Sequence, residues 1–387
     1  MKKCMCILLA VAMLLCMNVN ALAISNNSDE KDKTIALYGD GCFVFTSETP
    51  RNIKEYAARV FPVFFNDYMI ANGKDFTGEV ISLGSPINVK EADSENRIYH
   101  FPVMQGGAFV MMLSVYSVPF DDGTYPAQLM PNRILESLSG LREQSSIERP
   151  IEFISDENGL HGVINMSMAD TENNETKMGG SQQNIEKQMN VVDVTAPVTE
   201  IVIRSADTVA ETRSSYGNPL TGIYSVAQTV DGTFNYTETN SRNWCGAAMT
   251  ASIINYKCGK HLTAKDITTA AHGSAIDAGI TNKQVIDIAG QYNLSPVSGN
   301  PLSYTSVKTE INAGRPIYMQ MQRPEGTEKR YHALTLIGYD STTYTVLNPW
   351  KEDAYPIVKN NDGSKVTYFD EDGERTYTWY TSIYNWS

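Results

Sequence analysis

Residues 330–350 read RYHALTLIGYDSTTYTVLNPW, and this stretch decides the fold of the second half of the chain. Two runs of apolar and β-branched residues, 333–339 and 344–347, flank the turn sequence Asp340-Ser-Thr-Thr. This pattern predicts two antiparallel strands joined by a hairpin. His332 opens the first strand and Asn348 follows the second, so we expect both side chains at the same end of the hairpin, within reach of each other.

A second informative stretch, NWCGAAMTA at 243–251, places Cys245 at the start of an apolar helix. Apolar residues cover much of that helix, which predicts that it is buried between layers. A thiol at a helix N-terminus faces unpaired N–H groups and the positive end of the helix dipole, and both favour the nucleophilic thiolate. The same N–H groups, including that of Cys245, are placed to hold a developing oxyanion.

Cys245, His332 and Asn348 together predict a nucleophilic site. We expect the Asn348 amide oxygen to accept the His332 Nδ1 proton, which fixes the ring and turns its other nitrogen toward the thiol. Trp350 is expected to cover that hydrogen bond from solvent, and Trp244 to shield the thiolate from water. Taken singly, these residues have structural explanations: a small buried cysteine, a strand-end histidine and an Asn-Pro turn. The combination is more specific than any member.

The rest of the back half, residues 217–387, mixes both kinds of element. Helices are expected at 244–256, 282–292 and 305–312, with a further short helix opened by the capping box Thr263-Ala-Lys-Asp266. A strand is expected at 317–322, before the hairpin. Helices followed by hairpin-linked strands predict an α+β fold with an antiparallel sheet.

These motifs resemble the staphopain-type secreted bacterial cysteine proteases of the papain-like superfamily. The similar stretches are Trp244-Cys245, His332-Ala-Leu-Thr-Leu-Ile-Gly, Asn348-Pro-Trp and Trp379-Tyr-Thr-Ser-Ile-Tyr. The resemblance implies a two-lobed catalytic domain, with a helical lobe carrying Cys245 and an antiparallel sheet lobe carrying His332 and Asn348. It also implies peptide-bond hydrolysis through an acyl-enzyme, with Cys245 as nucleophile, His332 as general acid/base and Asn348 as orienting residue.

One position departs from that family. The family places a glutamine six residues before the cysteine as second oxyanion donor, and here that position is Thr239. Allowing one deletion, Asn240 is the residue we expect to replace it. Its side chain is one methylene shorter, and loss of such a donor typically costs on the order of 100-fold in rate.

The chain divides into four parts on sequence. Residues 1–23 combine Met1-Lys2-Lys3, a short apolar run and the small-residue site Ala21-Leu22-Ala23, which predicts a secretory signal peptide and an exported bacterial protein. Residues 24–168, the front half, are expected to form a mostly β pro-domain. Its predicted strands lie near 80–83, 97–103, 108–116 and 151–154, and its predicted helices near 52–61 and 132–143. Residues 169–216 read as a linker that carries the activating cleavage, and 217–387 as the catalytic domain.

Composition excludes several classes of protein. With 42% hydrophobic residues and a net charge of -13, the chain can bury cores and is not a general nucleic-acid binder. The spacing of its histidines and cysteines matches no zinc pattern, so no metal and no organic cofactor is expected. Cys42 and Cys258 are predicted to be packing residues, with a disulfide between them left open.

The sequence therefore predicts a secreted cysteine endopeptidase precursor. The expected partners are a protein or peptide substrate and the front half itself, acting as an intramolecular inhibitor that covers the cleft. No nucleic acid, no membrane after signal removal and a monomeric state are expected. Two alternatives stay open: a papain-fold amidase or acyltransferase that acts on cell-wall peptides, and a non-catalytic binding protein on the same fold.

Overall fold

The structure is a computed structural model of the whole chain. It describes residues 23–24, 33–38, 41–45, 49–74, 79–91, 96–106, 108–130, 151–156, 159–164, 191–193, 198–202, 219–237, 239–323, 330–370 and 376–387. The predicted signal peptide before Ala23, the predicted helix at 132–143 and most of the predicted linker lie outside these residues.

Three helices form one side of the back half: α5 (Cys245–Cys258), α6 (Ala264–His272) and α7 (Asn282–Gln291). Thr263 and Asp266 form the predicted capping box at the start of α6, and Thr281 and Gln284 form a second one at α7. Helix α5 is buried along most of its length because alanine and isoleucine occupy nearly all of its circumference. It packs against α6, α7 and strand β15, so both its ends are fixed by neighbours.

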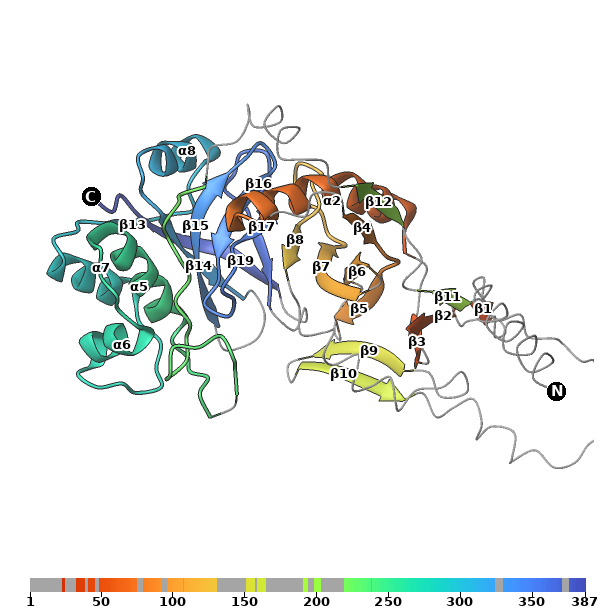
Figure 1. Cartoon of the computed structure of the whole chain (residues 1–387), viewed down its shortest axis with the longest axis horizontal. Coiled ribbons are helices and arrows are strands. Elements are labelled where there is room, and N and C mark those ends of the chain that lie inside the picture. The colour runs from red at the N-terminus through yellow and green to blue at the C-terminus, as the bar shows by residue number, and fades with distance from the viewer. Residues whose placement is uncertain are drawn as a thin grey trace, which may run out of the picture.

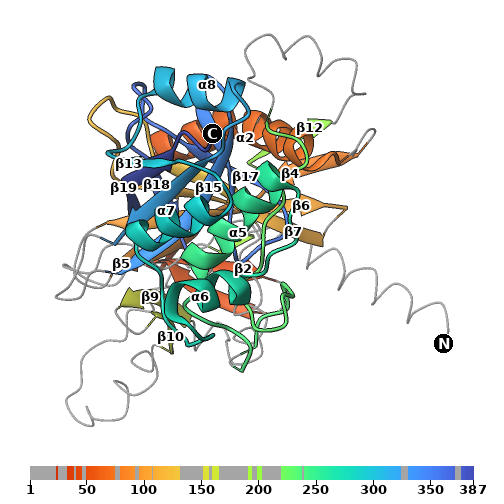
Figure 2. The ribbon, with the colours of Figure 1, turned by 90° about the vertical axis from the view of Figure 1, so that its left-hand side faces the viewer.

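The strands of the back half lie on the other side of α5 (Figures 1 and 2). They are β13 (Val297–Gly299), β14 (Ile317–Gln322), β15 (Tyr331–Tyr339), β16 (Thr343–Leu347), β17 (Tyr355–Val358), β18 (Thr367–Phe369) and β19 (Thr376–Tyr384), with helix α8 (Tyr304–Asn312) beside them. The strands pair antiparallel in the order β17, β16, β15, β14, β19, β18. The predicted hairpin is confirmed, with Leu336 opposite Val346 and a bulge before Gly338. The back half is thus the expected mixture of helices and antiparallel sheet.

The front half is mostly strand, as predicted. Its elements, with those of the predicted linker, are β1 (Ala23–Ile24), β2 (Lys33–Tyr38), β3 (Gly41–Phe45), α2 (Arg51–Asn72), β4 (Val80–Leu83), β5 (Ile87–Glu91), β6 (Arg97–Gln105), β7 (Ala108–Tyr116), β8 (Ala127–Met130), β9 (Ile151–Asp156), β10 (Gly159–Ile164), β11 (Val191–Asp193) and β12 (Thr199–Val202). Strands β9 and β10 pair antiparallel, with Gly159 opposite Asp156.

Helix α2 is longer than predicted. We expected it to stop near residue 61, but it continues through Pro62 and ends at Gly73, whose positive φ of 61° closes it. A proline removes one helical hydrogen bond, a cost of about 3 kcal/mol. Burial of Phe61, Phe64 and Phe65 along one face offsets that cost.

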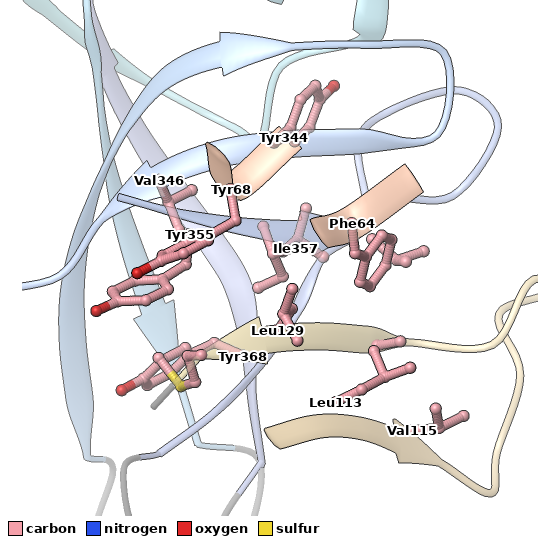
Figure 3. Close-up of a cluster of buried hydrophobic side chains, with 14 of the residues drawn as sticks. Phe64, Tyr68, Leu113, Val115, Leu129, Tyr344, Val346, Tyr355, Ile357 and Tyr368 are labelled. Carbon is pink, nitrogen blue, oxygen red and sulfur yellow. The ribbon is translucent and has the colours of Figure 1, made fainter. Parts of the chain in front are cut away.

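The two halves share one hydrophobic core. Figure 3 shows Phe64, Tyr68, Leu113, Val115 and Leu129 of the front half packed against five residues of the back half, Tyr344, Val346, Tyr355, Ile357 and Tyr368. Helix α2 lies on β16 and β17, and β8 extends the sheet by pairing with β17. The sequence predicts two folded units, and the structure shows that their buried surfaces are continuous.

Asp67 of α2 lies in this shared core. Its carboxylate accepts a hydrogen bond of 2.7 Å from the Thr343 hydroxyl of β16. Burial, with the nearby charge of Asp340, raises the pKa of Asp67 well above its ordinary value, against a smaller lowering by Thr343. A raised carboxyl pKa favours folding below the pKa of the unfolded state, and this contribution is lost as pH rises through the folded pKa.

Asp67→Asn is therefore expected to stabilise the chain at neutral pH. The amide keeps an acceptor for Thr343 and avoids ionising a buried group, so the gain is about 1–3 kcal/mol, or a few degrees in melting temperature. Thermal unfolding at neutral pH and at about pH 3 measures it, and the gain should disappear at the lower pH, where Asp67 is protonated in both states. Asp287→Asn, at an exposed carboxyl paired with Lys283, is the control. An equal gain at both pH values would contradict this account.

No helix among the described residues is both long and apolar enough to cross a membrane.

Candidate active site

Cys245 is the first residue of α5. Trp244, just before it, has non-helical backbone angles (φ -101°, ψ 17°) and makes no side-chain cap, so the N–H groups of the first turn have no capping side chain. Gly246 follows because space there is limited: a Cβ atom at this position would lie 3.0 Å from the Tyr318 hydroxyl and 3.1 Å from Ile280. The predicted thiol at a helix N-terminus is confirmed as a structural feature.

The surroundings of Cys245 lower the pKa of its thiol. Burial raises this pKa, but a hydrogen bond with His332 and the charge of that ring lower it, and the backbone N–H groups of Ala333 and Gly246 add to the lowering. The interactions that favour the thiolate outweigh burial. The structure thus brings the Cys245 thiol and the His332 ring together across the interface between helix α5 and strand β15.

His332 and Asn348 meet at the end of the hairpin, as predicted. His332 Nε2 lies 3.3 Å from Asn348 Oδ1, and Asn348 is fully buried. The Trp350 backbone N–H also donates to Oδ1, at 3.1 Å, and the Ser225 hydroxyl donates to the Asn348 carbonyl oxygen, at 2.7 Å. The bond from Trp350 holds the Asn348 side-chain amide, and the bond from Ser225 holds the Asn348 backbone. Both help to keep the amide oxygen in position for the histidine.

The predicted ring nitrogen was wrong. We expected Asn348 to bind Nδ1 of His332, but it binds Nε2, which leaves Nδ1 as the nitrogen for the thiol. In a histidine side chain Nε2 lies farther from the residue's own backbone than Nδ1 does, and it is this outer nitrogen that meets the buried Asn348 amide. Residue spacing along the sequence does not distinguish the two nitrogens.

Tyr368 of β18 covers the histidine ring, a role that sequence reasoning missed. Its ring stacks on His332 at 4.9 Å between centroids and 11° between planes, and its hydroxyl accepts a 3.0 Å hydrogen bond from Asn348 Nδ2. Tyr377 of β19 makes a tilted contact with the same histidine. The signal available in the sequence was a tyrosine in a short strand after the hairpin, which is too common to single out.

The two tryptophans predicted to shield the site have other contacts. The ring of Trp350 packs against Tyr236, 4.3 Å away between centroids, and lines the groove described below. Trp244 is 1% exposed, and its indole N–H donates to the Ile276 carbonyl at 2.8 Å. Trp244 therefore anchors the segment before α7 to the helical core, and its shielding of the thiolate stays a prediction.

A groove of about 1360 Å³ runs between the helices and the strands and contains the site. It is lined by Gln228, Ser241, Arg242, Asn243, Cys245, Gly246, Asp277, Gly279, Ile280, Thr281, Asn282, Lys283, Tyr318, Gln320, Arg330, Tyr331, His332, Ala333, Trp350, Tyr368, Asp370 and Tyr377. Both basic side chains (Arg242, Lys283, Arg330) and acidic ones (Asp277, Asp370) line it, so its charge is mixed. None of the described front-half residues lines it.

Asn240, the expected oxyanion donor, does not line this groove. Its side-chain Nδ2 donates to the Asn235 carbonyl at 2.8 Å, and its Oδ1 accepts from the Thr237 N–H at 2.7 Å, so the amide closes its own loop. Short loops with an Asn commonly satisfy their backbone in this way. The structure therefore gives Asn240 a structural role and does not support it as a donor.

Gln228 lines the groove that also contains Cys245, as Asn240 was expected to do. It is 3% exposed, and its backbone N–H donates to the Pro349 carbonyl. Its Oε1 is buried without a hydrogen-bond partner, which is unusual for a buried amide. The glutamine in Val226-Ala-Gln228 was missed in the sequence. The donor was expected about six residues before Cys245, and Gln228 lies farther from Cys245 along the chain than that.

The remaining candidates are structural. Cys258 is a free cysteine near the Tyr292 carbonyl, so it forms no disulfide with Cys42, whose side chain lies outside the described residues. His100 is buried and its Nδ1 lies 2.8 Å from the Ser114 hydroxyl. Among the described residues, no cluster of three or more His, Cys, Asp or Glu side chains is arranged to hold a metal ion.

Residues 225–375 match the model of the Peptidase_C39 like family, which covers less than half of the chain but includes Gln228, Cys245, His332 and Asn348. No curated protein matches the chain. Among solved structures, one described as a C39-like peptidase from Bacillus anthracis is 12% identical, with 42% of this chain and 96% of that chain covered and a TM-score of 0.30. That score is too low to carry an argument about the fold. The family match supports a cysteine-peptidase type but not the staphopains in particular. The segment that holds the site is thus similar to a family of cysteine peptidases.

Proposed function

We propose that this protein is a secreted cysteine endopeptidase that hydrolyses peptide bonds at Cys245. The observation that carries the proposal is the position of His332, which contacts the Cys245 thiol on one side and lies 3.3 Å from the Asn348 amide on the other. A binding protein would need none of these contacts. A thiol with a lowered pKa, beside a fixed imidazole in an open groove, is the arrangement that nucleophilic catalysis requires.

In the proposed reaction, His332 takes the thiol proton and Cys245 attacks the carbonyl carbon of the bound peptide. The C–S bond forms while the carbonyl oxygen becomes an oxyanion, which we place between the Cys245 N–H and the Gln228 side chain. His332 then gives its proton to the leaving amine as the C–N bond breaks, and a thioester remains. Water, deprotonated by His332, attacks the thioester and releases the carboxylic acid and the thiol.

Asn348 and Tyr368 hold the His332 ring in position for these proton transfers. The Asn348 amide oxygen accepts a hydrogen bond from the Nε2–H group. This bond holds the ring in the tautomer whose Nδ1 can take the thiol proton. The Tyr368 ring covers one face of the imidazole and limits its rotation. Both groups are almost fully buried, so they stabilise one ring orientation at little cost when the substrate binds.

The proposed substrate is a protein or peptide in extended conformation. The groove has a volume of about 1360 Å³ and carries mixed charges, which fits a polypeptide better than a single small molecule. The same proposal includes export as a bacterial precursor, inferred from the signal-like residues 1–23. It also includes a two-lobed papain-like arrangement. The sequence predicts that the front half inhibits the site, and this stays a prediction. The described front-half residues dock on β16, β17 and β18 and do not line the groove.

An irreversible epoxide inhibitor directed at thiols tests the proposal. The whole chain should be labelled at Cys245, as shown by mass spectrometry of the peptide, and should hydrolyse fluorescent casein. Cys245→Ala should lose both, while Cys258→Ala, which removes the other free cysteine of the back half, should keep both. Hydrolysis of cell-wall peptides without hydrolysis of casein would indicate the amidase class. Absence of labelling in the wild type would refute a catalytic thiol.

A further inference from the structure

Strand β18 is a short strand with little support from the back half. It pairs with β19 over only three positions, and just before it an isolated bridge joins Val366 to Lys359, the residue after β17. Yet this strand carries Tyr368, whose ring stacks on His332 and whose hydroxyl accepts from Asn348. The position of the histidine ring therefore depends on what holds the free edge of β18.

Gln128 of the front half holds that edge. Its side-chain Nε2 donates to the Phe369 carbonyl at 2.7 Å, and its Oε1 accepts from the Phe369 N–H at 3.0 Å. The amide thus makes the two main-chain bonds that a neighbouring strand would make. Its own strand, β8, pairs with β17 at Gln128 itself, opposite Ile357. One glutamine thereby spans the gap between β17 and β18.

These contacts are buried throughout. Gln128 is 3% exposed, and both Tyr368 and Phe369 are almost fully buried, so water cannot replace a lost hydrogen bond. Without the Gln128 amide, the Phe369 N–H and carbonyl would be buried without these partners, which is unfavourable. The strand can relieve this cost only by moving, and such a movement carries Tyr368 with it.

We propose that Gln128 is a positioning residue for catalysis: the front half holds β18 in place, and β18 in turn fixes the His332 ring through Tyr368. The inference rests on the proposed function of Cys245 and His332. It assigns the docked front half a role in support of the site, opposite in sign to the predicted inhibition. The three catalytic side chains are together in the structure while the front half is docked.

The chain offers a matched control at the same interface. Asn72 of α2 makes the same kind of double bond with a main-chain residue of the back half: its Nδ2 donates to the Ala354 carbonyl at 2.8 Å, and the Ala354 N–H donates to its Oδ1 at 2.7 Å. Ala354 precedes β17 and is not among the described partners of the His332 ring, which are Cys245, Asn348, Tyr368 and Tyr377. Gln128→Met and Asn72→Leu each remove two such bonds while nearly conserving volume.

The experiment measures the rate at which iodoacetamide alkylates Cys245 in the whole chain, followed by mass spectrometry of the Cys245 peptide. At about pH 6, where only a thiol paired with an imidazolium is ionised, Gln128→Met should react about tenfold more slowly than wild type. At about pH 9.5 the two should agree within about twofold, because any thiol is then largely ionised. Asn72→Leu should react like wild type at both values, although thermal unfolding should show both variants destabilised. All chains keep the same charged groups along the groove, which are Arg242, Asp277, Lys283, Arg330 and Asp370.

Gln128→Asn is the second variant, in case Gln128→Met does not fold. It keeps the amide but is one methylene too short for both bonds, so the same slow reaction at low pH is expected. A wild-type rate in the Gln128 variants, or an equal loss in Asn72→Leu, would overturn the positioning role. A faster reaction in the Gln128 variants would also overturn it and would favour inhibition by the front half. If wild-type Cys245 itself shows no enhanced reactivity at about pH 6, it is the proposed function that fails.

Discussion

His332→Ala is expected to lower casein hydrolysis by on the order of 10⁵-fold, about as much as Cys245→Ala. The His332 ring is the group that hydrogen-bonds to the thiol, and imidazole is the side chain that most often transfers protons in catalysis. It also supplies the hydrogen bond and the charge that lower the pKa of Cys245. The double variant should be no worse than either single one, because thiol and imidazole act as a unit.

The same variant should change the pH dependence of Cys245 alkylation. In the wild type, the lowered pKa of Cys245 means that the thiol is ionised at pH values where an ordinary cysteine is still protonated. Alkylation should therefore persist toward acid pH. Without His332, burial still raises the pKa of Cys245 and the interactions with the ring that opposed it are gone, so the midpoint of alkylation should move upward in pH. The measurement is the alkylation rate of the Cys245 peptide across the pH range.

His100→Ala is the control for loss of a buried histidine. His100 is fully buried, and its Nδ1 lies within hydrogen-bond distance of the Ser114 hydroxyl, so its removal should lower stability. It should leave the activity of the folded chain unchanged. An alkylation midpoint that does not move in His332→Ala would contradict the proposed thiol–imidazole pair, whatever the loss in hydrolysis.

The three residues of the site were predictable because each sits at a local boundary that the sequence marks. Cys245 precedes an alanine-rich helix, and His332 and Asn348 end the two strands of one hairpin. Hairpin geometry and helix polarity are local properties, so they follow from short stretches of residues. The ring nitrogen that Asn348 binds was not predictable in this way, because it depends on the direction from which α5 approaches the hairpin.

The contacts that were missed all join segments far apart in the sequence. Tyr368 reaches His332 from a strand beyond the hairpin, and Gln128 reaches β18 from the front half. A glutamine in a strand has no pattern that distinguishes an exposed side chain from one that completes a sheet edge. The length of α2 was missed for a related reason: the apolar face that continues past Pro62 is covered by β16 and β17, which the local sequence does not contain.

Gln228→Ala is expected to reduce turnover of casein by about 10²–10³-fold, with the substrate bound nearly as well as in the wild type. The reason lies in where the charge develops. Gln228 lines the groove beside Cys245, and an amide donor there strengthens its hydrogen bond as the carbonyl oxygen becomes an oxyanion, but contributes little before that. The loss should therefore fall on the rate constant and not on the Michaelis constant.

Asn240→Ala separates this account from the one based on family spacing. The Asn240 amide is occupied within its own loop, so its removal should loosen residues 235–240 and cost about 1 kcal/mol of stability while turnover stays within a few-fold of wild type. Alkylation of Cys245 should be unaffected in both variants, since neither side chain is among the groups that lower the pKa of the thiol. If Asn240→Ala lost turnover and Gln228→Ala kept it, the assignment of Gln228 as oxyanion donor would be wrong. The loop that contains Asn240 would then have to rearrange to bring the donor into the site. The opposite result would mean that the longer loop before Cys245 keeps the oxyanion donor and changes only its distance along the sequence.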